Sequence, residues 1–420
     1  MGIKMKTQTL SEKAILFKPK DIALACAHIE EMWNDLTKEN TEDNGTLIGL
    51  PYPYIVPSVN RKEKFVFEEM YYSDSYFIAR GLLQSGKNEL AEGMLENLIY
   101  MYKRFHIIPN ASRFYLTGRS QPPYLTSYIF DIYEADEKSV EWLREKIDTA
   151  ENEYRNVWTA SIQPNIRNVY KGLSRYYDIN YLDDLAEAES GWDMTTRYEG
   201  ECLSYIPVDL NSLLYKYEID IAKAYEIFGD EDTAEVWRQK ASVRANTMTS
   251  ELWIPSKGFF FDLNYETSEH SEVWSLAGFY TMWAGLATEI QAEKMVYNLK
   301  KFLKKDGLTT TASMIETDSR EISKQWAYPN GWAPLHWIVV HGLEKYGYHE
   351  EAEIVARKWL NANLEYHKFF GVFREAYNVV EPLADPVEGV YPSQTGFGWT
   401  NGVFLDLAKK YLDEEEKSQI

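Results

Sequence analysis

Several stretches of the chain hold polar and aromatic residues at a density that packing alone does not require. They are residues 67–77, 108–123 and 189–197, and, near the C-terminus, 325–334, 374–378 and 396–402. In the third stretch Trp192 directly precedes Asp193. An indole ring offers an apolar platform to the C–H face of a sugar, while nearby carboxylate, amide and guanidinium groups bond its hydroxyls. These stretches therefore predict a carbohydrate site.

Cleaving a glycosidic bond requires two carboxyl groups in different protonation states. One stays protonated and donates to the leaving oxygen, and the other is ionised and activates water or attacks the anomeric carbon. The chain has 65 Asp and Glu residues, so residue types alone do not select this pair.

The elements that must position these stretches are expected to be helices. Apolar residues at i, i+3, i+4 and i+7 predict helices over Asp21–Thr37, Glu89–His106, Ser139–Trp158, Pro207–Phe228, Asp232–Leu252, Ala292–Leu303, Ala333–Tyr346 and His349–Asn363. Gly258–Glu266 is the best candidate for a short strand or hairpin, and the polar stretches are expected to be loops. Because the sequence has neither a fixed-period repeat nor a low-complexity linker, it favours one all-α domain closed into a helical toroid.

Composition excludes some classes of partner. A net charge of −21, from 44 Lys and Arg against 65 Asp and Glu, opposes binding to nucleic acid and to anionic membranes. No apolar run approaches the roughly 18 residues of a membrane helix, and the N-terminus does not read as a secretory signal, so we expect a cytoplasmic protein. Cys26 and Cys202 are expected to be buried thiols. The seven histidines show no metal-binding spacing, and no cofactor or metal is expected.

Five motifs carry a resemblance to a known family. They are IPN.SR.YL..RSQPP, ESGWD..TR, PVDLN.LLY, QW.YPNGWAP and GFGWTNGV, within a similarity that runs from about Pro57 to Leu407. In this order they resemble the trehalases of glycoside hydrolase family 37, which are related to the glucosidases and glycosylglycerate hydrolases of family 63. The resemblance implies an (α/α)6 toroid and a reaction that inverts the anomeric centre.

The resemblance also implies roles for particular residues. Asp193, in the GWD motif, would be the general acid, and Glu375, in Arg374-Glu375-Ala376-Tyr377, would be the base that activates water. The substrate-binding residues would be Tyr72, Asp74, Asn110, Arg113, Arg119, Gln121, Gly191, Trp192, Gln325, Trp326, Trp332 and Trp399.

Each of these assignments has a structural alternative. Asp193 could cap a helix that begins at Met194, since Asp is a favoured N-cap residue. Glu375 could be a solvated loop acid that pairs with Arg374.

The same holds for the substrate-binding residues. Arg113 and Arg119 could be surface salt-bridge partners. Trp332 is expected in the wall of the site, whereas Trp399 fits the core as well as it fits the site.

Some positions depart from the pattern of the family. Val66 stands where the family has an arginine, Ser73 where it has a tryptophan, and Ala327 where it has an aspartate. Val390 replaces an acid, although Glu388 lies nearby in the sequence. Because a site that bonds a substrate hydroxyl discriminates by about 10⁴ against ligands that lack it, these changes bear on specificity.

The sequence therefore predicts an inverting α-glycosidase for a small α-glucoside, with α,α-trehalose hydrolysed to glucose as the main expectation. The alternative substrates are glucosylglycerate and mannosylglycerate, whose carboxylate Arg113, Arg119, Arg167 or Arg175 would bind. A toroid that binds sugar without catalysis is the alternative from another class, and a sugar epimerase is disfavoured because it would need paired histidines.

We expect a single domain over residues 1–420, with flexible ends at 1–20 and 413–420. The expected partner is a small sugar, with no nucleic acid and no membrane, and the sequence leaves the oligomeric state open.

Overall fold

The computed structural model describes residues 16–59, 66–160, 163, 166–313, 324–389 and 392–412. Two predictions therefore concern residues outside the described ranges. One is that of flexible ends, at 1–15 and 413–420, and the other is that Val390 replaces an acid of the family pattern. The first helix begins at Pro19, inside the segment predicted as the flexible N-terminal end.

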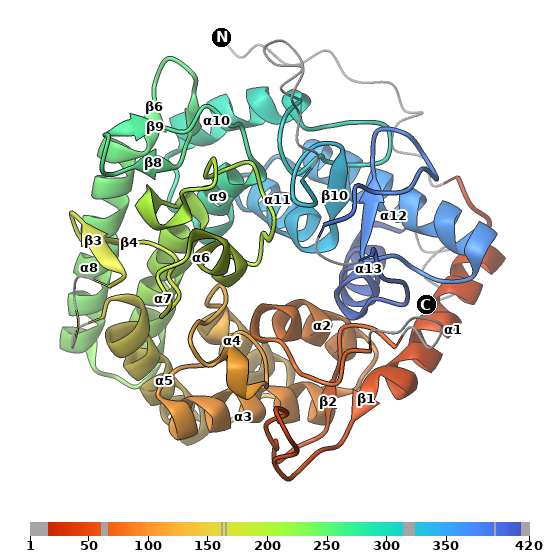
Figure 1. Cartoon of the computed structure of the whole chain (residues 1–420), viewed down its shortest axis with the longest axis horizontal. Coiled ribbons are helices and arrows are strands. Elements are labelled where there is room, and N and C mark those ends of the chain that lie inside the picture. Colours follow the sequence, from red (N-terminus) through yellow and green to blue (C-terminus); the bar gives the residue numbers. More distant parts are fainter. Residues whose placement is uncertain are drawn as a thin grey trace.

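Two concentric rings of helices form an (α/α)6 toroid (Figure 1). The inner ring consists of α2 (Tyr72–Gln84), α4 (Leu125–Ala135), α7 (Val208–Ile227), α9 (Tyr280–Ala284), α11 (Ala333–Lys345) and α13 (Gly398–Tyr411). The outer ring consists of α1 (Pro19–Leu36), α3 (Asn88–Phe105), α5 (Val140–Glu153), α8 (Glu231–Glu251), α10 (Glu289–Asn298) and α12 (His349–Phe370). Because α13 packs along α2, the last inner helix closes the ring on the first.

All eight predicted helices are present, whereas several helices were missed. The structure adds α2, α4, α9 and α13, and also the short α6 (Asp183–Glu189). Consequently, the predictions of loops at 67–77 and 396–402 are wrong in part, because α2 begins at Tyr72 and α13 at Gly398. Apart from α6, the missed helices all belong to the inner ring, whose other two members, α7 and α11, were predicted. For α2 and α13, the first turns lie in the stretches that are predicted as loops.

Short strands form hairpins between the helices. They are β1 (Thr37–Lys38), β2 (Tyr54–Ile55), β3 (Asn168–Tyr170), β4 (Leu173–Ser174), β5 (Tyr205–Ile206), β6 (Trp253–Ile254), β7 (Phe259–Phe260), β8 (Leu263–Asn264), β9 (Glu269–His270), β10 (Asn330–Trp332) and β11 (Ala376–Asn378). The predicted strand at Gly258–Glu266 is confirmed as β7 and β8. Antiparallel pairing of β10 with β11 sets Trp332 opposite Ala376 and so brings two distant motifs together.

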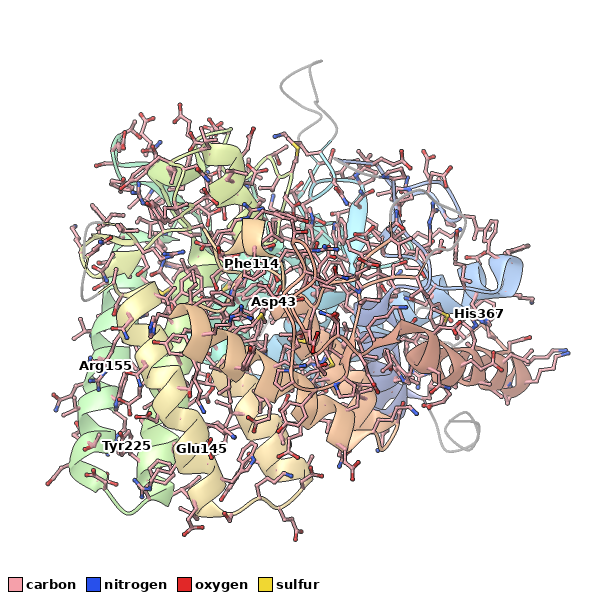
Figure 2. All side chains as sticks on the ribbon, turned by 60° about the horizontal axis from the view of Figure 1, so that its bottom comes forward. Asp43, Phe114, Glu145, Arg155, Tyr225 and His367 are labelled. Atoms are coloured by element: carbon pink, nitrogen blue, oxygen red, sulfur yellow. The ribbon has the colours of Figure 1, made fainter. Side chains whose placement is uncertain are left out.

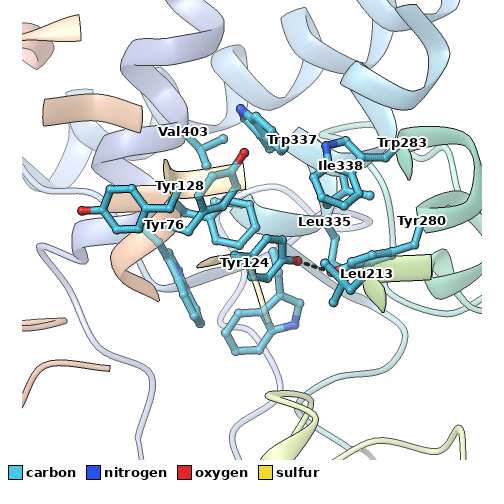
Figure 3. Close-up of a cluster of buried hydrophobic side chains, with 14 of the residues drawn as sticks. Tyr76, Tyr124, Tyr128, Leu213, Tyr280, Trp283, Leu335, Trp337, Ile338 and Val403 are labelled. Carbon is cyan, nitrogen blue, oxygen red and sulfur yellow. Dashed lines mark hydrogen bonds between the residues drawn. The ribbon is translucent and has the colours of Figure 1, made fainter. Parts of the chain in front are cut away.

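The core of the toroid is aromatic where the inner helices meet (Figure 3). Tyr76 of α2 stacks on Tyr124 with ring centroids 4.9 Å apart, and Trp337 of α11 meets Tyr76 edge-on at 5.6 Å. The hydroxyl of Tyr124 donates to that of Tyr280 over 3.0 Å, so each of these two buried hydroxyls has a hydrogen-bond partner.

A view turned by 60° shows the two ends of the toroid, at which the helices begin or end (Figure 2). Phe114 lies toward one end of the helices and Tyr225, near the C-terminal end of α7, toward the other. Cys26 and Cys202 are buried free thiols, as predicted. Of the helices in the described residues, none combines the length and the apolar character needed to cross a bilayer.

Candidate active site

A cavity of about 210 Å³ opens among the connections at the end of the toroid that carries the N-termini of α2, α11 and α13. Ligand pockets for drug-sized molecules are typically about 300–1,000 Å³, so this cavity suits a small ligand. Its lining includes Glu69, Tyr71, Ser73, Asp74, Asn110, Tyr115, Arg119, Gln121, Tyr124, Gly191, Trp192, Asp193, Tyr280, Trp326, Leu335, Phe397 and Trp399.

Asp193 lies in a loop that follows α6. The backbone N–H of Trp326 donates to the carbonyl of Met194 over 2.9 Å, and the Thr195 hydroxyl donates to the carbonyl of Trp326 over 3.1 Å. Glu187 of α6 accepts the N–H of Thr195 over 2.6 Å. Residues 190–201 are all described and contain no helix, so the prediction that Asp193 might cap a helix from Met194 is wrong.

Tryptophan rings build one wall of the cavity. Trp192 and Trp326 stack with centroids 5.6 Å apart, and Trp332 lies parallel to Trp326 at 3.9 Å on its far side. Trp399 meets Trp326 edge-on at 6.1 Å. Trp192, Trp326 and Trp399 line the cavity, whereas Trp332 supports Trp326 from behind. Such flat apolar surfaces suit the C–H faces of a sugar.

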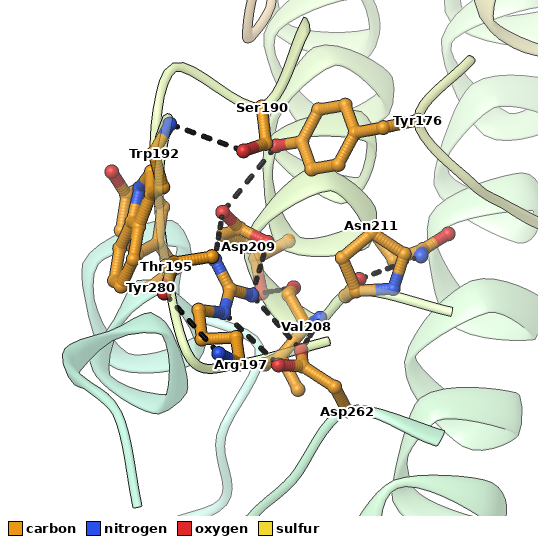
Figure 4. A network of polar contacts seen from close by, with 12 residues as sticks. Tyr176, Ser190, Trp192, Thr195, Arg197, Val208, Asp209, Asn211, Asp262 and Tyr280 are labelled. Atoms are coloured by element: carbon orange, nitrogen blue, oxygen red, sulfur yellow. Dashed lines mark hydrogen bonds and ion pairs between the residues drawn. The ribbon is translucent and has the colours of Figure 1, made fainter. Parts of the chain in front are cut away.

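A buried cluster of charges supports this wall (Figure 4). Arg197 has no exposed surface and donates to both carboxylate oxygens of Asp209, over 2.9 and 2.8 Å, and of Asp262, over 3.0 and 2.9 Å. Its guanidinium lies 4.3 Å from the ring centre of Trp192. The cluster therefore fixes the tryptophan beside Asp193 through a cation–π contact.

Carboxyl groups in and directly behind the cavity have raised pKa values. Burial raises the pKa of Asp193 to about 6, although the charge of Arg119 lowers it in part. Burial, together with the nearby charge of Asp193, raises the pKa of Asp74 to about 7. Burial also raises the pKa of Glu187, behind the loop, to about 7. Burial thus brings the pKa values of both cavity aspartates closer to neutral pH than that of a free carboxyl.

Amide and guanidinium groups supply the polar side of the cavity. Asn110 donates from Nδ2 to the carbonyl of Ser120 over 3.0 Å, which holds the loop that carries Arg119 and Gln121. Arg119 pairs with Asp178 over 3.2 Å. Its Nε is buried and makes no hydrogen bond to any described residue.

The structure brings eight of the predicted binding residues to the cavity: Asp74, Asn110, Arg119, Gln121, Gly191, Trp192, Trp326 and Trp399. Tyr72, Arg113, Gln325 and Trp332 lie outside its lining. Tyr72 instead hydrogen-bonds Tyr217 over 3.0 Å, and Arg113 pairs with Glu69 over 3.0 Å. Arg113 therefore holds a lining acid and does not reach the cavity itself.

Glu375 lies just behind the cavity lining. It is fully buried, its Oε2 accepts the N–H of Gln394 over 3.1 Å, and its carbonyl accepts the Trp399 indole N–H over 3.2 Å. Arg374 pairs instead with Asp385 over 2.8 Å. The alternative of a solvated acid paired with Arg374 is therefore wrong.

Sequence reasoning missed several lining residues. Tyr124, which directly precedes α4, and Tyr280, the first residue of α9, line the cavity where it meets the aromatic core. Nothing in the sequence distinguishes them from ordinary core tyrosines. Glu69 and Ser73 belong to a stretch that the sequence did indicate. Which side chains of this stretch face the cavity, however, depends on where α2 begins, at Tyr72.

The positions that depart from the family pattern fall in different places. Ser73 lines the cavity, whereas Val66 is 48% exposed and Ala327 is buried outside the lining. Glu388 is exposed and does not line the cavity either. The described residues hold no group of three His, Cys, Asp or Glu arranged to bind a metal ion.

A toroid with a buried acid and a tryptophan wall at one end is the arrangement of an (α/α)6 glycosidase. A family model described as trehalase matches residues 4–190 and 179–412, and the chain belongs to the trehalase family.

Two curated relatives are cytosolic neutral trehalases. The one from Saccharomyces cerevisiae is 32% identical over 96% of this chain and 61% of its own length, and the one from Kluyveromyces lactis is 32% identical over 93% and 59%. The chain thus spans about three fifths of the length of these relatives.

Solved structures of similar shape include two enzymes. A neutral trehalase from Saccharomyces cerevisiae aligns with a TM-score of 0.77 and 29% identity, over 94% of this chain and 81% of that one. A family 63 mannosylglycerate hydrolase from Thermus thermophilus, solved with glucose, aligns with a TM-score of 0.69 and 17% identity, over 91% and 99%. The second likeness concerns the fold alone.

Proposed function

We propose that the chain is an inverting α-glycosidase that hydrolyses α,α-trehalose to glucose, with Asp193 as general acid and Glu375 as general base. The observation that carries this proposal is Asp193 itself, whose pKa is raised to about 6 in a small cavity walled by tryptophans. Membership of the trehalase family, which covers most of the chain, supports the same activity.

In this mechanism protonated Asp193 donates its proton to the glycosidic oxygen as the bond to the anomeric carbon breaks. For the second proton transfer, the Glu375 carboxylate must reach the cavity from just behind its lining and take a proton from water, which attacks the anomeric carbon from the opposite face. The product keeps the new C–O bond in the inverted configuration, so α,α-trehalose gives one β-glucose and one α-glucose.

The charges around the cavity favour a neutral substrate over one that carries a carboxylate. Three acids, Glu69, Asp74 and Asp193, line it, and Arg119 is the one cation among the described lining residues. Arg119 already pairs with Asp178. Glu69 is already paired with Arg113, and the pKa values of Asp74 and Asp193 are raised, so the cation decides this preference: an anionic aglycone would find one guanidinium, which already has a partner.

The other arginines considered for a glycerate carboxylate have partners elsewhere. Arg167 pairs with Glu189, and Arg175 donates to the backbone carbonyl of Ile166 over 3.0 Å. Neither lies in the lining. Hydrolysis of glucosylglycerate or mannosylglycerate is therefore the second candidate, and Arg119 is the residue that would favour it.

The cellular setting follows from the relatives. Because both curated relatives are cytosolic neutral trehalases, we place this activity in the cytoplasm. A small sugar is the proposed partner.

Proton NMR tests the activity directly. The purified protein is mixed with trehalose, glucosylglycerate and mannosylglycerate in separate samples, and the first anomer released is recorded. We expect equal early signals of β- and α-glucose from trehalose. Hydrolysis of only a glycerate glycoside would replace trehalose by the second candidate, and binding without any hydrolysis would leave a sugar-binding toroid.

A further inference from the structure

Ser73 and Gln121 meet at the cavity in an unusual way. Both the backbone N–H and the hydroxyl of Ser73 lie 2.9 Å from Oε1 of Gln121 and donate to it. Ser73 lies in the first turn of α2, and Gln121 comes from the loop before α4. Two donors from one residue thus converge on one amide oxygen.

This contact fixes which end of the amide faces the cavity. A backbone N–H can only donate, so the atom it meets must be the carbonyl oxygen of the amide and not its nitrogen. The Nε2 of Gln121 makes no hydrogen bond to any described residue, and Gln121 lines the cavity. Its two N–H donors are therefore available to a ligand.

Asp74 follows Ser73 directly in the same turn and also lines the cavity. The charged group that faces Asp74 from another element is Asp193. The Ser73 hydroxyl has one proton, which it donates to Oε1 of Gln121, so its link is to the amide and not to the acid beside it.

We propose that Ser73 is a positioning residue, which holds the amide of Gln121 with its two N–H donors turned into the cavity to bind a hydroxyl oxygen of the sugar. This inference rests on the proposed function. It gives a role to position 73, where the trehalase pattern has tryptophan. A tryptophan has no hydroxyl, so only the backbone N–H of residue 73 would then donate to Gln121.

The first test compares Ser73→Ala with Ser75→Ala. Ser75 is a buried serine of the same helical turn whose hydroxyl donates to the carbonyl of Tyr71, and it does not line the cavity. We expect Ser73→Ala to lower kcat/KM for trehalose by about 3- to 10-fold, the effect of one lost hydrogen bond, mainly through KM. Ser75→Ala should leave kcat/KM within about twofold. Equal kinetics for the two variants would overturn the proposal.

Steady-state kinetics and thermal unfolding together separate positioning from stability. Ser73→Ala should raise KM for trehalose more than it lowers kcat, because the amide of Gln121 binds the sugar and takes no part in proton transfer. Ser75→Ala should keep the wild-type KM. If Ser73→Ala lowers only the melting temperature and leaves KM unchanged, its role is structural and the proposal fails.

One further variant and one crystal structure complete the design. Gln121→Glu keeps the acceptor for Ser73 but removes the N–H donors, and we expect a loss larger than that of Ser73→Ala, at least about tenfold. A crystal structure of Ser73→Ala should show a less well-ordered Gln121 side chain, because the backbone N–H of residue 73 alone then holds the amide. This order is measured without any sugar, so a Gln121 side chain as well ordered as in the wild type overturns the positioning role even if trehalose proves not to be a substrate.

Discussion

Two groups of buried aspartates lie on either side of Trp192 and serve opposite purposes. On the core side, Asp209 and Asp262 enclose Arg197 with four hydrogen bonds of 2.8–3.0 Å. On the cavity side, Asp74 and Asp193 line the cavity, where their pKa values rise to about 7 and about 6. The residue type is the same, and the partners differ.

This difference separates support from chemistry. A guanidinium that binds a buried carboxylate through two oxygens favours its ionised form. Burial still raises the pKa of Asp262, but the charge and hydrogen bonds of Arg197 oppose that rise. Among the described residues, Asp74 and Asp193 have no such bidentate partner, which is the condition that the proposed acid catalysis requires.

The comparison is tested most strongly by removing the reactive carboxyl groups. We expect Asp193→Asn and Glu375→Gln each to lower kcat for trehalose by about 10²–10⁴, because each removes a proton-transfer step. The fold should persist, as judged by unchanged circular dichroism. Glu388→Gln, an exposed acid outside the lining, should keep activity within about twofold. Near-normal turnover in either catalytic variant would remove that residue from its role.

Removing the cation between Asp209 and Asp262 should lower the stability of the fold. We expect Arg197→Met to lower the free energy of unfolding by about 3–5 kcal/mol, because it leaves two buried carboxylates without their cation. Urea unfolding at pH 7 measures this loss. A decrease below about 1 kcal/mol would mean that Asp209 and Asp262 do not depend on Arg197, and the distinction between the two groups would weaken.

The pH dependence of stability should also differ between paired and unpaired acids. The pKa of Asp74 is about 7 in the folded protein, above its unfolded value, so the folded state binds the proton more tightly. Stability from this group is therefore present below about pH 4 and is lost as the pH rises to about 7, by up to about 4 kcal/mol. Asp74→Asn should remove this loss, which urea unfolding at pH 4.5 and 7.5 detects.

Asp43 provides the matched control for this measurement. A hydrogen bond from Arg104 lowers the pKa of Asp43 to about 2, so this acid is ionised in both states across the same pH range. Asp43→Asn should change stability equally at pH 4.5 and 7.5. If Asp74→Asn behaves in the same way, Asp74 does not titrate as a buried unpaired acid.

The smallest effect is expected at the surface. Arg238 of α8 pairs with Glu226, Glu231 and Glu235, one carboxylate more than Arg197 binds, but it is in contact with solvent. Arg238→Met should cost less than about 1 kcal/mol in urea unfolding, because water screens these pairs. A loss as large as that of Arg197→Met would show that the number of partners matters more than burial.

The sequence by itself determined the class of fold, the family and the candidate acids. Helical periodicity located the outer helices and two of the inner ring, α7 and α11, and the motifs around Asp193 and Glu375 carried the resemblance to the family. It did not locate α2 or α13, since their first turns lie in polar, aromatic stretches that resemble loops.

Only the tertiary structure decided which residues face the cavity. Tyr124 and Tyr280 line it at the starts of α4 and α9, whereas Arg113 and Trp332 stand one layer behind it. The direction of a side chain depends on where its helix begins and on what packs behind it, and both come from segments distant in sequence. The same reason decides that Arg197 binds Asp209 and Asp262 and not Asp193.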